Sequence, residues 1–419
     1  MNRRRLMATL GLLGILVTGV LIWRPWRGEA PAGAAPAQPA LAGPPAIVND
    51  RAGNLLVITA GATPITLTSD AAPSRQYLQI TPAPDGRQVA YVAAEAGRSR
   101  LLVQALDGTP ARAVYESADR LPFYLYWAPD SRSLAFLASD AAMHLYVVPA
   151  DGSAPASEVR EGQPSYFDWA ADSTRLLLHT GGGAPRGSIA THTLEGGQLE
   201  VFPDAPGDFQ APAWDAAGSA RFVVLSDGTR NRLVRIAGEE QLDLSPRTVD
   251  AIVFSPAPDR SRLAYMTLGS ASRSPIHVVS ASGGDTSDLP PLRPLAFFWS
   301  PDGTRIASLV LEPQGVGPSA DSGVVLVAQS AQSAPLRMHW EVTTLAGNDH
   351  QRFAPFVPSE AFLNLLPYFD QYALSLPLWS PDGARLIYGT AAGVASLTIS
   401  DGATTILSDG TQGFWVPGK

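Results

Sequence analysis

The chain has 419 residues, of which 45% are hydrophobic and 16% are charged, and its formal net charge at pH 7 is −8. The hydrophobic share is enough for a large folded core, whereas the negative balance provides no basic surface for nucleic acid. Because the chain has no cysteine, it can form no disulfide, thiolate metal site or cysteine nucleophile. Composition therefore argues against a nucleic-acid-binding protein and leaves other binding functions open.

The N-terminal segment 1–27 is predicted to be a membrane anchor. Leu6 to Trp23 carry no charge, and as a helix this run spans about 27 Å, just enough for a bilayer core. Arg3 to Arg5 precede the run, so the N-terminus is expected in the cytoplasm and the rest of the chain on the extracytoplasmic side of the cell membrane, in the periplasm. A cleavable signal peptide is the alternative.

Residues 28–46 are predicted to be a linker, because they are almost entirely alanine, proline and glycine. A segment of this composition buries too little apolar surface to fold and behaves as a semi-extended tether. The folded part of the protein is therefore expected to occupy residues 47–419, held a short distance from the membrane.

A block of the form aromatic-Ser-Pro-Asp-Gly-x-Arg recurs through residues 47–419 and is clearest at 299–305. Ser-Pro-Asp-Gly is typical of a type I turn, with proline fixing φ at the second position. The residues before the turn alternate as in a strand, and a second strand follows, so each block is predicted to be a β-hairpin. The clearest copies contain Trp127 and Asp130, Trp169 and Asp172, Trp299 and Asp302, and Trp379 and Asp382; weaker copies run over 80–86, 214–218 and 254–260.

The turn aspartates recur about every 43 residues, which is the length of a four-stranded propeller blade. A helical solenoid of similar period does not fit, because the apolar residues alternate with period two and are interrupted by Gly, Pro or Asp-Gly at short intervals. The sequence therefore predicts an all-β propeller of four-stranded blades.

The two ends of the folded part are predicted to complete one blade together. Residues 54–59 and 64–68 match the third and outer strands of a blade that lacks its first strand, and residues 413–418 are a degenerate copy of the repeated block. A ring closed in this way has no exposed sheet edges. Seven copies and this composite blade give eight blades, and seven blades are the alternative.

The repeated block resembles the propeller repeat of the TolB-like, or WD40-like, bacterial propellers, and that of the N-terminal propeller of the dipeptidyl peptidase and prolyl oligopeptidase families. The resemblance extends over most of residues 47–419. It implies the fold but no single function, because this superfamily contains binding proteins, enzymes and accessory domains.

Motifs for catalysis were sought along the whole chain. There is no Gly-x-Ser-x-Gly elbow, no His-Glu-x-x-His, no EF-hand loop and no Walker loop, and no hydrolase domain follows the repeats. The six histidines are scattered singly, so neither a metal site nor a cofactor is expected. The turn aspartates are expected to cap their turns, together with the arginine three residues on, and the repeated tryptophans are expected to pack between blades.

One interval breaks the period, between Asp302 and Asp382, and holds an insertion at about 314–377. Ser359 is a suitable N-cap, and Pro367 is expected to end a short helix. The residues after it combine aromatic rings with one carboxylate, as binding hot spots do. The alternative is a helix that packs on the flank of the ring or across one mouth. The residues predicted to bind a partner are Tyr368, Phe369, Asp370 and Tyr372.

These observations predict a membrane-tethered, extracytoplasmic propeller that is not an enzyme and that binds a protein, a peptide or a cell-envelope polymer. One alternative is a propeller enzyme, a lyase or hydrolase with its site at a channel mouth. Such an enzyme should bring acidic, histidine or arginine side chains together from several inner strands. The other alternative is an accessory propeller that serves a separately encoded enzyme or transport system.

Overall fold

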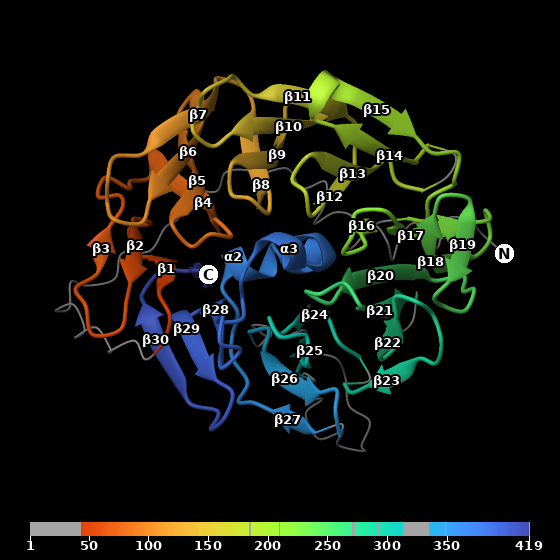
Figure 1. Cartoon of the computed structure of the whole chain (residues 1–419). Coiled ribbons are helices and arrows are strands. Elements are labelled where there is room, and N and C mark those ends of the chain that lie inside the picture. Colours follow the sequence, from red (N-terminus) through yellow and green to blue (C-terminus); the bar gives the residue numbers. More distant parts are fainter. Residues whose placement is uncertain are drawn as a thin grey trace, which may run out of the picture.

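The computed structural model describes residues 43–183, 186–208, 210–269, 273–291, 293–312, 335–347 and 349–418. They form eight β-sheets arranged as a ring around a central channel (Figure 1), of which seven have four strands and one has three. The predicted eight-bladed propeller is therefore confirmed. The predicted anchor and most of the linker lie outside the described residues. Among the residues described, no helix is both long and apolar enough to cross a membrane.

Each blade is an antiparallel meander whose first strand lies nearest the channel and whose last strand lies at the rim (Figure 1). Blade 2 consists of β4 (Arg75–Pro82), β5 (Gln88–Glu95), β6 (Arg98–Ala105) and β7 (Arg112–Ser117). Blade 3 consists of β8 (Leu121–Trp127), β9 (Ser133–Ser139), β10 (Met143–Pro149) and β11 (Ser157–Glu161). Blade 4 consists of β12 (Ser165–Trp169), β13 (Arg175–Thr180), β14 (Ser188–Thr193) and β15 (Gln198–Val201), with the 3-10 turn η1 (Glu195–Gly197) before β15.

The next three blades repeat this order, and their inner strands are again short and buried. Blade 5 consists of β16 (Ala213–Trp214), β17 (Arg221–Ser226), β18 (Asn231–Ala237) and β19 (Glu240–Asp243). Blade 6 consists of β20 (Ala251–Pro256), β21 (Arg262–Leu268), β22 (Ile276–Ser280) and β23 (Ser287–Leu289). Blade 7 consists of β24 (Ala296–Trp299), β25 (Arg305–Leu311), β26 (Met338–Thr344) and β27 (His350–Arg352). Blade 8 consists of β28 (Arg385–Thr390), β29 (Gly393–Thr398) and β30 (Thr404–Ser408).

Both ends of the described chain contribute to blade 1, as the sequence predicted. Its inner strand is β31 (Gly413–Trp415), which pairs with β1 (Ala46–Asn49), and β1 in turn pairs with β2 (Leu55–Ile58). The rim strand is β3 (Ile65–Thr66). The sequence had placed Ala46 in the linker and had assigned no strand to the four residues of β1. Those residues are nevertheless fully or almost fully buried, so this short apolar run is the second strand of the closing blade.

The first turn is held by its aspartate in six blades, as predicted. In blade 7 the backbone N–H of Gly303 donates to the carbonyl of Ser300 at 2.8 Å, and that of Thr304 donates to the Asp302 carboxylate at 3.0 Å. We call the face of the ring that carries these turns the turn face. Asp85, Asp130, Asp172, Asp259 and Asp382 each accept the equivalent bond from the residue two positions on.

The repeated tryptophans join neighbouring blades and form no open aromatic cage. Trp127 is 2% exposed, and its indole N–H donates to the carbonyl of Thr81 in the preceding blade at 2.9 Å. Trp169, Trp299 and Trp379 make the equivalent bond to the blade before them. The predicted packing of these side chains between blades is therefore confirmed.

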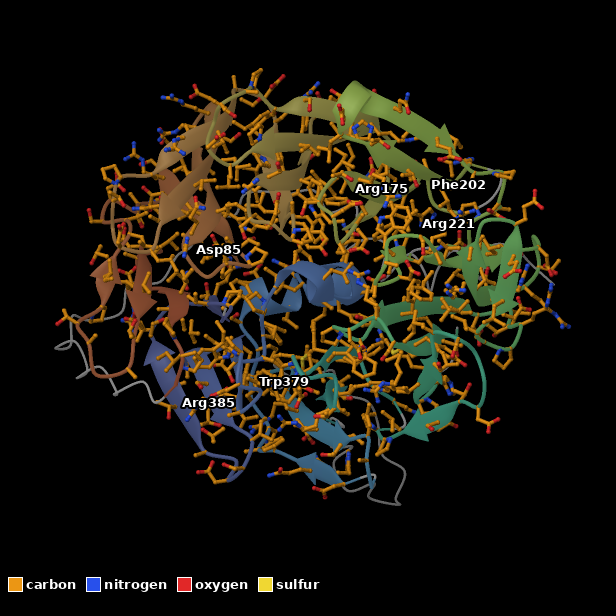
Figure 2. The ribbon with its side chains drawn as sticks, in the orientation of Figure 1. Asp85, Arg175, Phe202, Arg221, Trp379 and Arg385 are labelled. Atoms are coloured by element: carbon orange, nitrogen blue, oxygen red, sulfur yellow. The ribbon has the colours of Figure 1, made fainter. Side chains whose placement is uncertain are left out.

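The repeated arginines reinforce the same junctions. Arg305 donates to the carbonyl of Gly383 in the next blade at 2.7 Å, and its guanidinium lies 5.2 Å from the centre of the Trp379 ring. Arg175 and Arg262 make the equivalent pair of contacts, and Arg175 lies where blades 4 and 5 meet (Figure 2). An arginine over an aromatic face adds a cation–π attraction. The main role of these arginines is therefore between blades, although Arg175 also forms an ion pair with Asp172 at 3.1 Å, as expected.

Candidate ligand pocket

The insertion before blade 8 folds into helices that lie across the central channel (Figure 1). They are α2 (Glu360–Leu363), η2 (Leu366–Tyr368) and α3 (Phe369–Ser375). Ser359 caps α2 as predicted, since its hydroxyl accepts from the N–H of Phe362 at 3.1 Å. The prediction that Pro367 ends the helical segment is wrong. Proline is tolerated in a first helical turn, and here it begins η2, which leads directly into α3.

Helix α3 contacts the inner strands of blades 3, 4, 6 and 7 and so fills one end of the channel. The Phe369 ring lies 5.1 Å from that of Phe297 on β24. On the opposite side of the channel, Tyr124 of β8 donates to the backbone carbonyl of Gln371 at 2.9 Å, and its ring lies 5.1 Å from that of Tyr372. We call α2, η2 and α3 together the plug. A helix across one mouth of the ring, the alternative raised from the sequence, is therefore what the structure contains.

The residues predicted to bind a partner form part of the plug. Phe369 and Asp370 are each 4% exposed, and Tyr368 and Tyr372 are half-buried. The Asp370 carboxylate accepts from the backbone N–H of Ala211 at 2.9 Å, and its burial raises its pKa to about 6. The expectation that these side chains are all open to a partner is therefore wrong for Phe369 and Asp370, because both pack inward. A binding role for the four residues stays a prediction.

A second feature of the channel is an ion pair that the sequence analysis did not identify. The carboxylate of Asp168, on β12, is fully buried and lies 2.5 Å from Nη1 of Arg260, which follows β20. The same carboxylate accepts from the hydroxyl of Tyr126 at 3.1 Å and from the backbone N–H of Trp214 at 2.9 Å. Although burial alone would lower the pKa of Arg260, the charge of Asp168 raises it above its usual value. This network connects blades 3, 4, 5 and 6.

Arg260 occupies an unusual backbone position for a long side chain. It follows the turn aspartate of blade 6 and has a φ of 57°, in the left-handed region. The equivalent positions in other blades are occupied by small residues with similar φ values, namely Gly86, Ser131, Ser173, Gly303 and Gly383. Left-handed backbone costs a residue other than glycine roughly 1–2 kcal/mol, and such strain often marks functional positions. Its side chain extends from this turn to Asp168.

A cavity of about 310 Å³ lies beside Arg260, between the plug and the turn face. Ala373 and Leu374 of α3 line it from the plug side, and Pro258 and Pro301 line it from the first turns of blades 6 and 7. The pocket therefore has a floor formed by α3. Its remaining walls are mostly aromatic and apolar, and consist of Tyr126, Ser255, Pro256, Ala257, Arg260, Phe298, Trp299, Leu376, Pro377, Leu378 and Trp379.

Few hydrogen-bonding groups of this pocket are available to a ligand. The indole N–H groups of Trp299 and Trp379 already donate to backbone carbonyls, each at 3.1 Å. Arg260 donates from Nη1 to Asp168 and to the carbonyl of Trp214, and from Nη2 to Asp168. A guanidinium has five N–H donors. The hydroxyl of Tyr126 also contacts this guanidinium, and among the described residues no hydrogen bond is found for Nε. Arg260 is therefore the principal polar group that the pocket offers.

Several solved structures share the propeller fold of this chain. A prolyl endopeptidase has a TM-score of 0.53 at 13% identity, with 80% of this chain and 50% of that one covered. An oligogalacturonate lyase in complex with manganese has a TM-score of 0.52 at 14% identity, with 90% and 99% covered. TolB from Acinetobacter baumannii has a TM-score of 0.41 at 17% identity, and this chain spans 65% of its length. No protein-family model and no curated protein matches the sequence.

The similarity to a prolyl endopeptidase agrees with the resemblance predicted from the repeat. At such low identities the similarity concerns the fold alone. The ligand and the chemistry of this chain must therefore be argued from its own side chains.

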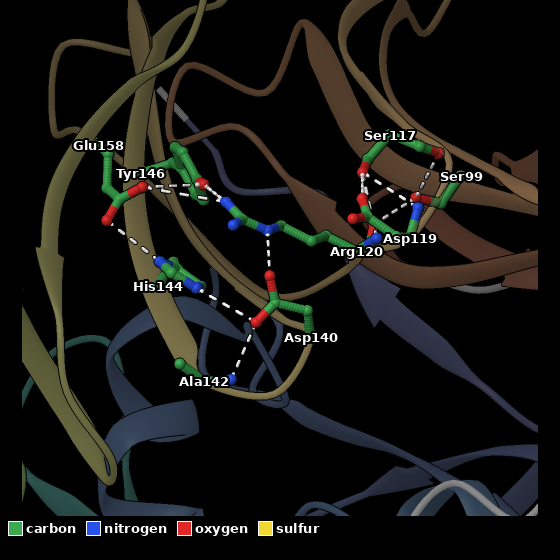
Figure 3. A network of polar contacts seen from close by, with 9 residues as sticks. All are labelled: Ser99, Ser117, Asp119, Arg120, Asp140, Ala142, His144, Tyr146 and Glu158. Carbon is green, nitrogen blue, oxygen red and sulfur yellow. Dashed lines mark hydrogen bonds and ion pairs between the residues drawn. The ribbon is translucent and has the colours of Figure 1, made fainter.

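Clusters outside the channel form closed networks. Arg120 donates to Asp140 of blade 3 at 2.7 Å and contacts the hydroxyl of Tyr146, and its backbone carbonyl accepts from the hydroxyl of Ser99 in blade 2 (Figure 3). His144 lies between Glu158, at 3.0 Å, and Asp140, and its pKa is raised chiefly by the hydrogen bond to Glu158. The opposite charges of this network are paired with one another, which indicates a structural role. Within the described ranges, no three histidine, aspartate or glutamate side chains are placed so that they could share a metal ion.

A signal for the pocket was nevertheless present in the sequence. The residue before each repeated tryptophan faces the channel in several blades, where it is an aromatic or aliphatic residue such as Tyr126 or Phe298. Asp168 is the acidic exception at this position, just as Arg260 is the basic exception at the turn position. The two are 92 residues apart, but both lie on the channel side of their repeats. Comparison of the repeats position by position would have selected them as a pair.

Proposed function

We propose that this chain is a TolB-like binding module that recognises a protein or peptide partner at the pocket on its turn face. The observation that carries the proposal is the pocket itself, which is closed by the plug at one end and lined by two tryptophans and a half-buried arginine. Concave, mostly apolar sites with a few placed polar groups are the usual form of ligand sites.

The Asp168–Arg260 network is the observation that bears on an enzymatic alternative, because it brings an acid and a base together from separate blades. Each oxygen of Asp168 already accepts two hydrogen bonds within the network. A catalytic acid or base must be within reach of a proton on the substrate, and this carboxylate has no free acceptor position for one. We therefore propose a binding role and no lyase or hydrolase activity for the site.

We further propose that residues 1–27 anchor the chain in the cell membrane and that the propeller lies on the extracytoplasmic side. The described chain begins on the turn face: a Cβ at Gly43 would lie 2.9 Å from Nη1 of Arg385, and Ala46 pairs with Trp415 at the turn end of β31. The linker therefore leaves from the face that carries the pocket. This arrangement would keep the pocket on the side from which the tether runs to the membrane.

Site-specific photo-crosslinking in cells tests the binding role. A benzophenone amino acid at Pro258, which is exposed at the pocket rim, should crosslink a defined partner. The same probe at Asn364, which is exposed on the plug, is the matched control. Filling the pocket with Ala373→Phe should abolish the crosslink at Pro258 without changing the melting temperature. Equal crosslinking at both positions, or an unchanged crosslink in the filled variant, would contradict the proposal.

A further inference from the structure

We infer that the pocket selects an uncharged apolar side chain of a polypeptide, and that Arg260 donates to a backbone carbonyl beside that side chain. The inference rests on the proposed binding role and names the chemical class of its ligand. It is drawn from the charge balance of the pocket, from its supply of hydrogen-bonding groups and from its size.

The charge balance argues against a charged ligand group. The guanidinium of Arg260 is already neutralised by the fully buried carboxylate of Asp168 at 2.5 Å. A carboxylate or ammonium that entered the pocket would therefore bring an unbalanced charge into a desolvated site, which is unfavourable. A neutral carbonyl, by contrast, can accept from the Nε–H of Arg260 without changing the net charge. The bond would be strengthened by the charge on the donor.

The engagement of most polar side chains in the pocket argues against a sugar. A saccharide carries a hydroxyl on most ring carbons, and each hydroxyl buried without a partner loses its bonds to water. In this pocket the indole N–H groups of Trp299 and Trp379 and the hydroxyl of Tyr126 are already engaged. Aromatic and proline rings instead offer flat apolar surface to an apolar side chain. An apolar side chain of a polypeptide needs no hydrogen bond of its own. Only the backbone group beside it needs a polar partner.

The size and shape fit a single large side chain. A volume of about 310 Å³ is at the lower end of the range for small-molecule pockets. Because α3 forms a floor, the pocket accepts a side chain inserted from the turn face and does not let a strand pass through the channel. Proline, aromatic or branched aliphatic side chains on an exposed loop of the partner meet these conditions.

The ligand class can be tested with synthetic probes and the purified propeller. The probes are N-acetylated, C-amidated hexapeptides whose central residue is Trp, Phe, Pro, Leu, Asp or Lys, together with one neutral and one acidic hexasaccharide. Calorimetric titration should detect binding of the apolar peptides, with affinities at least about tenfold higher than those of the Asp and Lys peptides. The saccharides should not bind.

Two variants place the binding in the pocket. Ala373→Phe, or the smaller change Ala373→Leu if the first variant melts early, should remove peptide binding by filling the cavity. The pair Arg260→Gln with Asp168→Asn removes both charges together and should weaken the apolar peptides about tenfold, because the carbonyl loses a charged donor.

The outcomes separate the two proposals. If a saccharide or a charged peptide binds best and Ala373→Phe abolishes its binding, the pocket is a binding site but the inferred ligand class is wrong. If no probe binds while the crosslink at Pro258 is observed, the inferred class is again wrong. If the crosslink itself is absent, the proposed binding role fails.

Discussion

Asp370→Asn should make the propeller more stable at neutral and alkaline pH while leaving its stability near pH 4 almost unchanged. The Asp370 carboxylate is 4% exposed, and no cation contacts it among the described residues. Burial is the main cause of its raised pKa, and the N–H of Ala211 offsets only part of that effect. The asparagine side chain keeps an oxygen to accept from Ala211, so the substitution removes the charge and retains the bond.

The magnitude follows from the difference between folded and unfolded pKa values. The pKa rises from 3.8 to about 6 on folding, and one pKa unit corresponds to about 1.4 kcal/mol. Below pH 3.8 the Asp370 carboxyl is protonated in both the folded and the unfolded chain, so no buried charge lowers the stability of the protein. As pH rises from about 4 to 6, the unfolded chain loses its proton while the folded chain keeps it, so stability falls by up to ~3 kcal/mol. Asp370→Asn removes this fall.

The assay compares parent and variant by chemical and thermal denaturation between pH 2 and pH 8. For a protein of this size, ~3 kcal/mol corresponds to a shift of roughly 4 °C in melting temperature. Asp227→Asn is the control, because hydrogen bonds from Thr229 lower the pKa of Asp227 to about 2. Its stabilising effect is present at neutral pH and is lost on acidification, so that variant should be less stable than the parent at pH 7 and should converge with it in acid. If Asp370→Asn lowers stability at neutral pH, where the parent carboxylate is charged, the reasoning is wrong.

Three further changes test the fold and its attachment. Deletion of Thr411–Lys419 removes β31 with the fully buried Trp415 and should cost at least about 3–5 kcal/mol; unchanged denaturation would exclude the closing blade. Arg260→Met leaves the charge of Asp168 buried and should cost about 3–5 kcal/mol, part of which Asp168→Asn should restore; losses that simply add would contradict a coupled pair. A truncated protein that starts at Gly43 should be soluble and unfold cooperatively, whereas the full-length chain should stay with membranes after a carbonate wash; release by that wash would contradict the anchor.

The parts of the fold that could be predicted are those that every blade repeats. Trp299 and Asp302 each take part in a local structure that recurs in other blades, so several copies supported the same interpretation. β1 could not be predicted in this way, because only three apolar residues and Asn49 follow a proline-rich linker, and their partner strand, β31, lies at the other end of the chain. α3 was missed because Pro367 was interpreted as a helix end, although proline suits the start of a helix equally well.

The candidate site was harder to predict than the fold, because it depends on contacts between repeats. The predicted binding residues were chosen because they combine aromatic rings with one carboxylate, namely Tyr368, Phe369, Asp370 and Tyr372. Binding surfaces and buried plugs can both have this composition. Only the packing of α3 against four blades distinguishes the two. The pocket also requires the ring to be closed, since its walls come from blades 3, 6, 7 and 8 and from the plug.

Positions at which one blade has a different type of residue from the other blades remain the best guide to function in this chain. A small residue is sufficient for the left-handed turn position, as Gly303 and Gly383 illustrate in the blades that follow. Turn geometry therefore does not account for Arg260, whose conformation costs free energy that glycine would avoid. The contacts of its guanidinium do account for it, because they balance the buried charge of Asp168. Arg260 also lines the pocket. The strain at Arg260 is therefore explained by the four-blade network that its side chain closes, and its place in the wall of the cavity is what the proposed binding role builds on.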